Sequence, residues 1–362
     1  MRSKAYEAWQ LKMKQTGIKK RVPVCGQFEL TPRCNFDCKM CYVHNQNSNS
    51  LKSRELTTEQ WKRIFDEAYD AGMMFATLTG GECLLREDFR ELYLHLWNKR
   101  VMVTVLTNGY LINDDYVAFF EKYQPDLIQI TLYGSSEDGY RNVTGHTGFA
   151  KVMGNLKKLR DAGINLTVTV TPSKYGADDY IDTIQVVRDN GFNLELAEMI
   201  LLSKRDDPVS TEHNLSLDEI VDLSIKRMEL YCDVIPVAET PKPCGNCTEA
   251  PCGLTCNAGN GLACVIWDGT MYPCGNAMAG EGASLLQMSY AEAWEKTKAA
   301  TDSVVLPAEC VGCPYEEVCS TCPPMRALDM DSGHCNPAIC EMTRRLVAAG
   351  VKKLNLPEKT DE

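Results

Sequence analysis

Six short apolar segments in the first two-thirds of the chain alternate with segments of helical periodicity. Each strand candidate is partly β-branched or aromatic, and several end at Gly or Pro. The helix candidates place apolar residues three or four positions apart; in residues 57–72, Thr58 is expected to cap the helix and Gly72 to end it. The strand candidates are residues 27–31, 75–81, 102–109, 127–134, 165–171 and 193–200.

This alternation predicts an α/β fold with a parallel sheet and right-handed crossovers. Periodicity alone leaves open whether the sheet is doubly wound or an incomplete barrel. In either architecture ligands lie at the carboxyl ends of the strands. Residues 34–41, 80–82 and 107–109 follow the first three strand candidates, so we expect them to meet at one edge of the sheet.

Bulk composition excludes several classes of protein. A chain of 362 residues is long enough for about two domains. The net charge of −11 argues against nucleic acid as a partner, because nucleic-acid-binding surfaces carry clustered Lys and Arg. There is no apolar run of about 18 residues, so no membrane partner is expected. The basic N-terminal stretch lacks the apolar core of a secretory signal, which predicts a cytoplasmic location.

Eighteen cysteines are distributed unevenly, with five before residue 232 and thirteen from Cys232 onward. In a reducing setting, clustered cysteines are more often metal ligands than disulfides. The C-terminal part is rich in Pro, Gly and Cys and shows little periodicity between helix candidates at 216–232 and 341–354. We therefore expect metal clusters to hold this part together.

Cys34, Cys38 and Cys41 lie within eight positions in the stretch LTPRCNFDCKMCYV. Structural zinc almost always closes a shell of four ligands, for which His44 is a nearby fourth candidate. A [4Fe–4S] cluster held by three thiolates instead keeps one iron open for a ligand from outside the protein.

The Cys34-x3-Cys38-x2-Cys41 motif, followed by TLTGGECLL, resembles the radical S-adenosylmethionine (radical SAM) superfamily. The resemblance implies a partial (β/α)6 TIM-like barrel. It also implies that SAM occupies the open iron and that the reduced cluster cleaves SAM to methionine and a 5′-deoxyadenosyl radical. That radical abstracts a hydrogen atom from the substrate.

The resemblance also implies a set of SAM contacts. The GGE motif would bind the methionine amino group, Asn108 would lie near the ribose, Thr131 would contact SAM and Arg141 would meet its carboxylate. Met40 stands where the family often has an aromatic residue, and Cys83, expected to be buried, stands where many relatives have Pro. The implied contacts are Met40, Tyr42, Gly80, Gly81, Glu82, Asn108, Thr131 and Arg141.

A second resemblance lies in the C-terminal cysteines, which are similar to the cluster-stabilised SPASM extension of radical SAM peptide maturases and imply two auxiliary [4Fe–4S] clusters, or three clusters in all. The implied ligands are Cys252, Cys256, Cys274 and Cys322 for the first, and Cys310, Cys313, Cys319 and Cys340 for the second. Cys244 and Cys247 are alternatives to Cys252, an open iron in the first cluster is a further alternative, and Cys264 and Cys335 are surplus. Two zinc ribbons are the alternative reading of the CxxC pairs.

The two resemblances together predict the organisation of the chain. The expected parts are an N-terminal extension (1–23), the radical SAM core (24–215), a linker helix (216–243), the SPASM domain (244–345) and a C-terminal helix end and tail (346–362). The extension is too short for the leader-recognition domain that some of these enzymes carry, so leader binding would require a separate leader-binding protein or another surface of the chain. Residues 132–152 are also similar to the peptide-modifying subgroup.

The expected reaction is modification of a ribosomally made peptide by a thioether or carbon–carbon crosslink, or a related oxidation. A formylglycine-forming sulfatase maturase is disfavoured because Gly275 stands where those enzymes carry Asp. A small-molecule substrate and, more remotely, a non-catalytic zinc or iron–sulfur scaffold are the alternatives. Asp268, Tyr272 and Glu198 are candidate bases, none of which the sequence selects. A flavodoxin or ferredoxin is the expected reductant.

Overall fold

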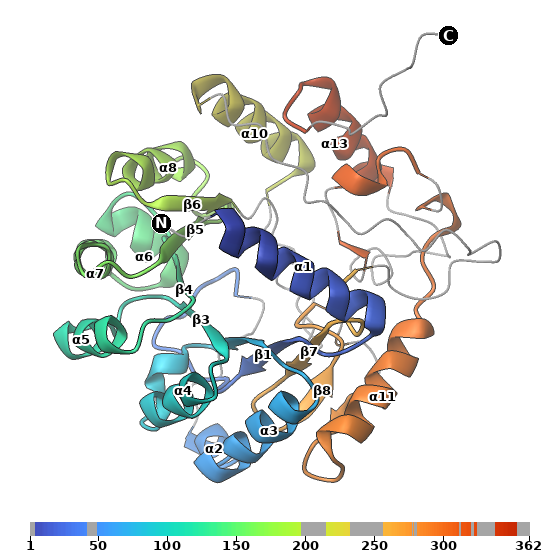
Figure 1. Ribbon diagram of the computed structural model, residues 1–362. Coiled ribbons are helices and arrows are strands. Elements are labelled where there is room, and N and C mark those ends of the chain that lie inside the picture. Colours follow the sequence, from blue (N-terminus) through green and yellow to red (C-terminus); the bar gives the residue numbers. More distant parts are fainter. Residues whose placement is uncertain are drawn as a thin grey trace. The chain divides into compact units, whose positions relative to one another are not determined.

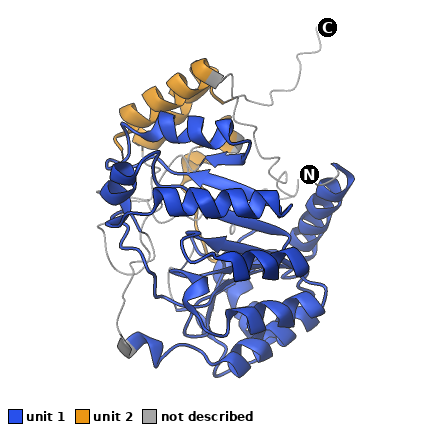
Figure 2. Cartoon of the chain, turned by 90° about the vertical axis from the view of Figure 1, so that its left-hand side faces the viewer, with its two compact units in different colours: residues 1–214, 257–302 blue, residues 215–256, 303–362 orange. Residues whose placement is uncertain are grey.

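A computed structural model of the chain describes residues 4–41, 49–196, 215–231, 256–276, 278, 281–310, 313–319, 322–323 and 337–352. The chain forms two compact units. Unit 1 comprises residues 1–214 and 257–302, and unit 2 comprises residues 215–256 and 303–362 (Figure 2).

Unit 1 contains a nine-stranded sheet with the order β6-β5-β4-β3-β2-β1-β7-β8-β9. Neighbouring strands from β6 to β7 are parallel, whereas β8 and β9 join as antiparallel strands. The strands are β1 Cys25–Glu29, β2 Phe75–Thr79, β3 Met102–Thr107, β4 Leu127–Thr131, β5 Leu166–Val170, β6 Asn193–Leu196, β7 Leu262–Val265, β8 Thr270–Tyr272 and β9 Ala283–Ser284. The predicted parallel sheet of six consecutive strands is confirmed.

The helices of unit 1 follow the strands in alternation (Figure 1). They are α1 Lys4–Lys20, α2 Asn49–Lys52, α3 Thr58–Asp70, α4 Phe89–Asn98, α5 Asp114–Lys122, α6 Glu137–Thr144, α7 Phe149–Asp161, α8 Tyr180–Asp189 and α11 Tyr290–Asp302, with the 3-10 turn η1 Cys83–Leu85. Unit 2 contains α10 Leu217–Tyr231, η2 Ala308–Cys310, η3 Glu316–Val318 and α13 Pro337–Ala348. Of the described helices, none is both long enough and apolar enough to span a bilayer.

Helix α3 illustrates how local sequence sets these elements. Its apolar residues at helical spacing, Trp61 and Phe65 among them, are fully buried. The predicted cap is one residue off: Thr57 is the N-cap, and its side chain forms a capping box with Gln60. Thr58 is instead the first helical residue. Gly72, at φ +107°, follows the helix end as predicted.

The two faces of the parallel sheet differ in polarity. One face is aliphatic or aromatic and fully buried, and Phe28 on it packs edge-on against Phe65 of α3. The other face is polar and half-buried. The buried face includes Phe28, Leu78, Val105, Ile128 and Val168, and the polar face includes Gln27, Thr77, Thr104, Gln129 and Thr167. A doubly wound sheet is covered by helices on both faces and is apolar on both. Here α3 to α8 lie along one side (Figure 1), as in an incomplete barrel.

Residues 257–302 cluster with unit 1, although the sequence placed them in the predicted 244–345 domain. Strand β7 extends the sheet beyond β1, and the first residue of α11, Tyr290, donates its N–H to Glu67 of α3 at 2.7 Å. These strands were not predicted because two to four residues are too short to reveal a period of two. The Asp268-Gly269 dipeptide between β7 and β8, with Gly269 at φ +87°, was the available signal of a hairpin.

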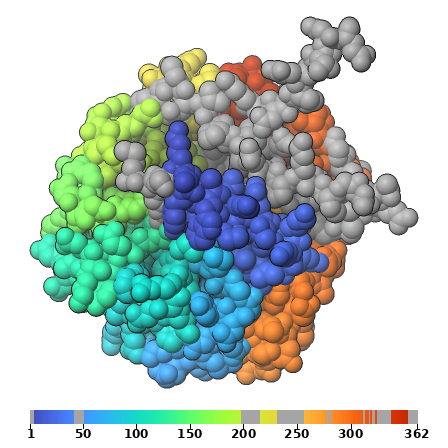
Figure 3. Space-filling view, viewed as in Figure 1, coloured from blue at the N-terminus to red at the C-terminus, as the bar shows by residue number. Residues whose placement is uncertain are grey.

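Helix α1 packs against the amino ends of strands in unit 1. The Tyr6 hydroxyl donates to Asp126, just before β4, at 2.7 Å, and the Trp9 ring lies 6.1 Å from that of Phe75 at the start of β2. Gly17 permits close contact, because a Cβ there would lie 2.3 Å from a Val24 methyl group. The space-filling view shows α1 in dark blue on the surface, next to cyan and teal parts of the chain (Figure 3).

Candidate functional site

The loops after β1, β2 and β3 meet at the carboxyl edge of the sheet, as predicted from the strand order. The Gly81 N–H donates to the Thr31 carbonyl at 2.8 Å, and the Glu82 N–H donates to the Arg33 carbonyl at 2.7 Å. These bonds fasten the loop after β2 to the residues directly before Cys34.

Glycine is required at both positions of the Gly-Gly pair. A Cβ at Gly80 would lie 2.6 Å from the Thr31 carbonyl oxygen, and one at Gly81 would lie 2.4 Å from that of Arg33. Both distances are far below van der Waals contact, and the obstructing atoms belong to the backbone. The glycines therefore allow two loops to touch, which adds a structural reason to the predicted approach of SAM.

Glu82 is fully buried, and donors surround its carboxylate. The Thr107 hydroxyl lies 2.8 and 2.9 Å from its two oxygens, the Asn108 N–H 2.8 Å and the Leu84 N–H 3.0 Å. Burial raises the pKa of Glu82, and the bonds from Asn108, Leu84 and Thr107 oppose that rise. Glu82 thus ties the loop after β2 to the loop after β3; its contact with the SAM amino group stays a prediction.

Asn108 connects the TNG segment to the cysteine loop. Its side-chain amide donates to Asn35 Oδ1 at 2.8 Å and lies 3.7 Å from Cys34 Sγ. The sequence placed Asn108 beside the SAM ribose, which stays a prediction, but did not anticipate these contacts or the role of Thr107. The signal was the TNG motif itself, whose partners can be identified only when the chain is folded.

The cysteine loop is held by its neighbours on both sides. Cys34 Sγ accepts the Phe36 N–H at 3.4 Å, and the Asp37 N–H donates to the Thr144 carbonyl at the end of α6. The Phe36 ring is buried and stacks on His146, at 5.9 Å between centroids, with three tyrosines also around it. Those three tyrosines are Tyr110, Tyr133 and Tyr140.

The thiols of the loop influence one another. Burial raises the pKa of Cys34 to about 12, and the nearby charges of Glu82 and Cys41 act in the same direction. Burial likewise raises the pKa of Cys38 well above its usual value, and Cys41 and Cys34 add to the rise, whereas a hydrogen bond with Tyr133 lowers it. Because burial and mutual repulsion disfavour their charged forms, these three cysteines can be thiolates together only when a cationic group binds them. The donor set fits a cluster held by three cysteines.

A buried ionic network supports the residue before Cys34. Arg33 Nε lies 2.6 Å from Glu55 Oε1, and the Thr31 hydroxyl donates to the same oxygen. Arg86 contacts Glu55 at 3.5 Å and donates to the Leu30 carbonyl at 3.2 Å. Because charged side chains so buried must be paired, this network fixes the path of the chain from β1 into the cysteine loop.

The other residues predicted to contact SAM make none of the hydrogen bonds described above between the three loops. Met40 is buried against Val143, and Thr131 ends β4 in register with Thr169. Arg141 pairs with Asp138 on the exposed side of α6 at 2.7 Å, so its role at the SAM carboxylate stays a prediction. Tyr42 and His44 lie outside the described residues.

Cys83 and Asp268 behave as ordinary structural residues. Cys83 is fully buried, as expected, and its thiol donates to the Leu106 carbonyl at 3.4 Å. The Asp268 carboxylate accepts the Thr270 N–H at 3.0 Å, which closes the turn before β8. Tyr272 lies on β8 and Glu198 lies outside the described residues. None of these positions identifies a base.

The four cysteines predicted for the second auxiliary cluster line one cavity of unit 2. They come from η2, the segment after it, the end of η3 and α13. These residues are Cys310, Cys313, Cys319 and Cys340. Four thiols around one cavity are the donor set of a [4Fe–4S] cluster with no open iron.

The first auxiliary cluster stays a prediction. Cys274 follows β8 in unit 1, whereas Cys256 and Cys322 belong to unit 2. Cys274 Sγ accepts the Asn276 N–H at 3.2 Å, the same two-residue turn that Cys34 makes with Phe36. Cys252 and its alternatives Cys244 and Cys247 lie outside the described residues, as does Cys335; Cys264 is buried in β7.

Comparison with known proteins identifies the N-terminal part. A sequence model described as the radical SAM superfamily matches residues 28–187. The chain is 27% identical over 207 residues to the sporulation killing factor maturation protein SkfB of Bacillus subtilis, covering 57% of this chain and 49% of that protein. It is 31% identical over 174 residues to the PqqA peptide cyclase of Ruegeria pomeroyi, covering 47% and 45%. The matched part thus spans about half the length of these relatives.

The fold is also that of a solved structure. Streptococcus suis SuiB bound to S-adenosylmethionine superposes with a TM-score of 0.67 at 16% identity, over 94% of this chain and 84% of that one. SuiB has also been solved bound to its precursor peptide SuiA. The sequence match covers the three loops that meet around Cys34, and residues 28–187 match the radical SAM superfamily.

Proposed function

We propose that the chain cleaves SAM reductively at a [4Fe–4S] cluster bound by Cys34, Cys38 and Cys41, and that it uses the resulting radical to modify a ribosomally made peptide. The observation that carries the proposal is the meeting of three loops at one edge of the sheet. Asn108 joins them, because its backbone N–H reaches Glu82 and its side chain reaches Asn35 beside Cys34. When bound, the reduced cluster would supply the electron that divides SAM into methionine and a 5′-deoxyadenosyl radical.

The protein's own residues would hold and shield that chemistry. Phe36 and the rings around it exclude water from one side of the cysteine loop. Hydrogen bonds from Phe36 N–H to Cys34 and from Tyr133 to Cys38 stabilise thiolate charge. Glu82 keeps the GGE loop at a fixed distance from Cys34 through Thr107 and Asn108. Hydrogen abstraction needs no protein base, so positioning is the main contribution of the chain.

Two further groups complete the proposal. The cavity of unit 2 would hold one auxiliary cluster, and Cys274 would contribute to another. The peptide substrate is supported by the relatives, since SkfB is a maturation protein, the Ruegeria protein is a peptide cyclase and SuiB binds a precursor peptide. A thioether or carbon–carbon crosslink is the proposed product. A cytoplasmic setting with a flavodoxin-like or ferredoxin-like reductant would suit this chemistry.

Anaerobic reconstitution with iron, sulfide, SAM and dithionite tests the reaction. The expected result is 5′-deoxyadenosine, with about twelve irons per chain for three [4Fe–4S] clusters. Cys38→Ser should abolish 5′-deoxyadenosine and remove about four irons. Cys83→Ser is the matched control, because a hydroxyl can still donate to the Leu106 carbonyl. A fully loaded protein that forms no 5′-deoxyadenosine, or one that takes up zinc instead of iron, would contradict the proposal.

A further inference from the structure

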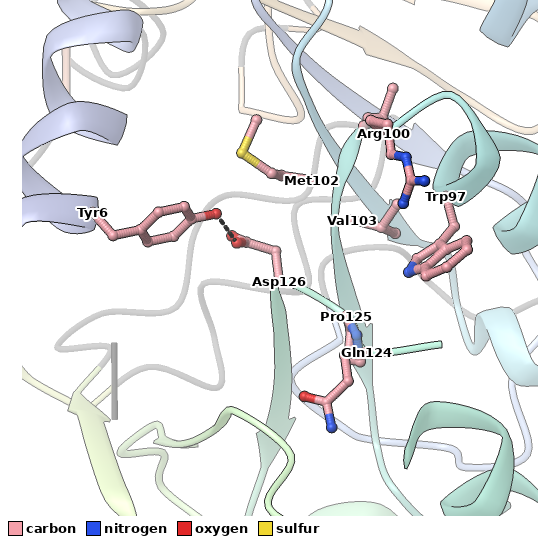
Figure 4. A pocket seen from close by; sticks show the side chains of 9 residues that line it. Tyr6, Trp97, Arg100, Met102, Val103, Gln124, Pro125 and Asp126 are labelled. Carbon is pink, nitrogen blue, oxygen red and sulfur yellow. Dashed lines mark hydrogen bonds between the residues drawn. The ribbon is translucent and has the colours of Figure 1, made fainter. Parts of the chain in front are cut away.

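An open pocket lies at the amino ends of β3 and β4, between α1 and the end of α4, and we name it the α1–β3 pocket (Figure 4). Its volume is about 560 Å³, which is within the range of ligand sites. Tyr6 reaches from α1 to Asp126 on one side, and Trp97 and Arg100 stand on the other. The cysteine loop lies at the opposite, carboxyl ends of the strands.

Arg100 and Trp97 line the pocket, and Tyr123, next to Trp97, and Lys122 lie outside the lining. The Arg100 guanidinium lies 5.5 Å from the centre of the Trp97 ring, and Trp97 meets Tyr123 edge-on at 5.3 Å. Lys122 in turn lies over the Tyr123 ring at 5.0 Å. Within the described part of the chain, neither Arg100 nor Lys122 forms an ion pair. Arg100, held on a ring without a carboxylate partner, is therefore available to an anionic ligand in the pocket.

The surrounding charge favours such a ligand. Helix α1 carries five Lys and one Glu, in a chain whose net charge is −11. The acidic residue lining the pocket, Asp126, already accepts bonds from the Tyr6 hydroxyl at 2.7 Å and from the Gln10 amide at 3.1 and 3.2 Å. The pocket thus presents one unpaired cation, Arg100, and the Trp97 ring, while its carboxylate accepts hydrogen bonds from Tyr6 and Gln10.

We propose that the α1–β3 pocket docks an acidic segment of the peptide substrate, with Arg100 as its principal anion contact and Trp97 as its apolar platform. This inference rests on the proposed function for the identity of the ligand. The pocket and the cysteine loop lie at opposite ends of strands of five or six residues. Because a strand rises about 3.3 Å per residue, they are about 20 Å apart along the sheet. A fully extended peptide covers that distance in about six residues, so the docked segment lies at least about six residues from the modified residue along the peptide.

Fluorescence anisotropy with a labelled decapeptide of Glu and Leu tests the docking. We expect the reconstituted protein to bind it, and the same peptide with every Glu replaced by Gln to bind about tenfold more weakly or less. Arg100→Glu should weaken binding of the acidic peptide about tenfold or more, whereas Arg100→Lys should retain most of it. The backbone of Arg100 is left-handed, with φ at +64°. Glu and Lys adopt this conformation about as readily as Arg, so both substitutions keep the local backbone. Binding should also weaken with salt.

Arg90→Glu is the matched control. Arg90 lies on α4, which ends two residues before Arg100, and its guanidinium lies over the Tyr116 ring at 4.5 Å, but it does not line the pocket. The Arg90→Glu variant should bind the acidic peptide as tightly as the wild type does. Equal binding of the two peptides, or unchanged binding by Arg100→Glu, would overturn the inference.

The two proposals fail independently. Formation of 5′-deoxyadenosine without peptide should be unchanged in Arg100→Glu, because the pocket is remote from the cysteine loop. If the wild type forms 5′-deoxyadenosine but the peptide binds without dependence on Arg100, only the docking inference fails. If the peptide binds through Arg100 but no 5′-deoxyadenosine forms, only the proposed function fails.

Discussion

At the scale of single residues, the candidate site is built from side chains whose polar groups already have partners. The Glu82 carboxylate is enclosed by Thr107, Asn108 and Leu84, and the Glu55 carboxylate by Thr31 and Arg33. The residues of the GGE and TNG motifs, predicted to bind SAM, thus also hold the loops together by hydrogen bonds. Substitutions here are expected to disturb the geometry of the loops before they remove a contact with SAM.

Gly81→Ala tests this view. Its added Cβ would overlap the Arg33 carbonyl oxygen at 2.4 Å, so the two loops must separate. We expect formation of 5′-deoxyadenosine to fall about tenfold or more, while the secondary structure seen by circular dichroism is retained. Gly154→Ala is the control, because nothing lies within 4 Å of its added Cβ. Equal activity of both variants would show that the loops tolerate separation.

At the scale of elements, the segment 132–152 contains α6 and the start of α7, and its side chains cap both helices. The Ser136 side chain caps α6 by accepting the Gly139 N–H at 3.0 Å. Gly145, at φ +75°, ends the helix in the left-handed conformation that suits glycine. Glu137 reaches forward to the first turn of α7. The pattern that resembled a peptide-modifying subgroup therefore has a physical role in placing α6 against the cysteine loop.

Glu137→Gln should lower the stability of unit 1 by about 1 kcal/mol at pH 7. Hydrogen bonds from the N–H groups of Ala150, and then of Gly148 and Phe149, hold the pKa of Glu137 below its usual value. A lowered pKa means that the stabilisation is complete above the unfolded value of about 4.3 and is lost as the pH falls through the folded value. Urea unfolding of both proteins from pH 7 to pH 3 measures this.

Asp138→Asn provides the comparison for that variant. Asp138 is exposed and pairs with Arg141 one turn away, an arrangement that contributes a few tenths of a kcal/mol at most. A pH-independent difference between Glu137→Gln and the wild type would show that the carboxylate charge is not what caps α7.

At the scale of the whole molecule, the cysteine-rich part is divided between the two compact units. Residues 257–302 belong to the sheet and helices of unit 1, whereas the four-cysteine cavity belongs to unit 2. Strand β7 is stabilised by pairing with β1, from Cys25 opposite Leu262 to Phe28 opposite Val265. The two parts should therefore respond differently to the loss of iron.

Cys340→Ser should lower the iron content from about twelve to about eight per chain. Because the thiols around this cavity would lose their cluster, unit 2 should become sensitive to proteolysis, while 5′-deoxyadenosine formation persists. Cys264→Ala is the control, since this buried residue of β7 is not an expected ligand. Unchanged iron in Cys340→Ser would remove Cys340 from the cluster.

Hydrogen exchange distinguishes the two units directly. We expect the amides of β7 to be protected to the same degree as those of β1, and to keep that protection in Cys340→Ser. Mass spectrometry of peptic fragments covering residues 262–265 and 25–29 measures both strands at once. Loss of protection in β7 alone would place residues 257–302 with unit 2.

The sequence by itself determined the features that arise locally. Periodicity over five to fifteen residues predicted the six strands and the helices between them, and the spacing of Cys34, Cys38 and Cys41 predicted a three-thiolate site. Because parallel strands end at one edge of a sheet, the strand order alone predicted that the loops after β1, β2 and β3 meet. It could not show how tightly the loops are fastened, because Glu82 and Thr107 are 25 positions apart.

Tertiary structure decided what depends on residues distant in sequence. The pairing of β7 with β1 joins positions more than 230 residues apart, and the α1–β3 pocket requires Tyr6 to meet Asp126, 120 residues away. The separate short segments around Cys340 likewise carry no period that reveals their shared cavity. Local periodicity fixes which face of an element is apolar, but only packing selects the distant surface that covers it.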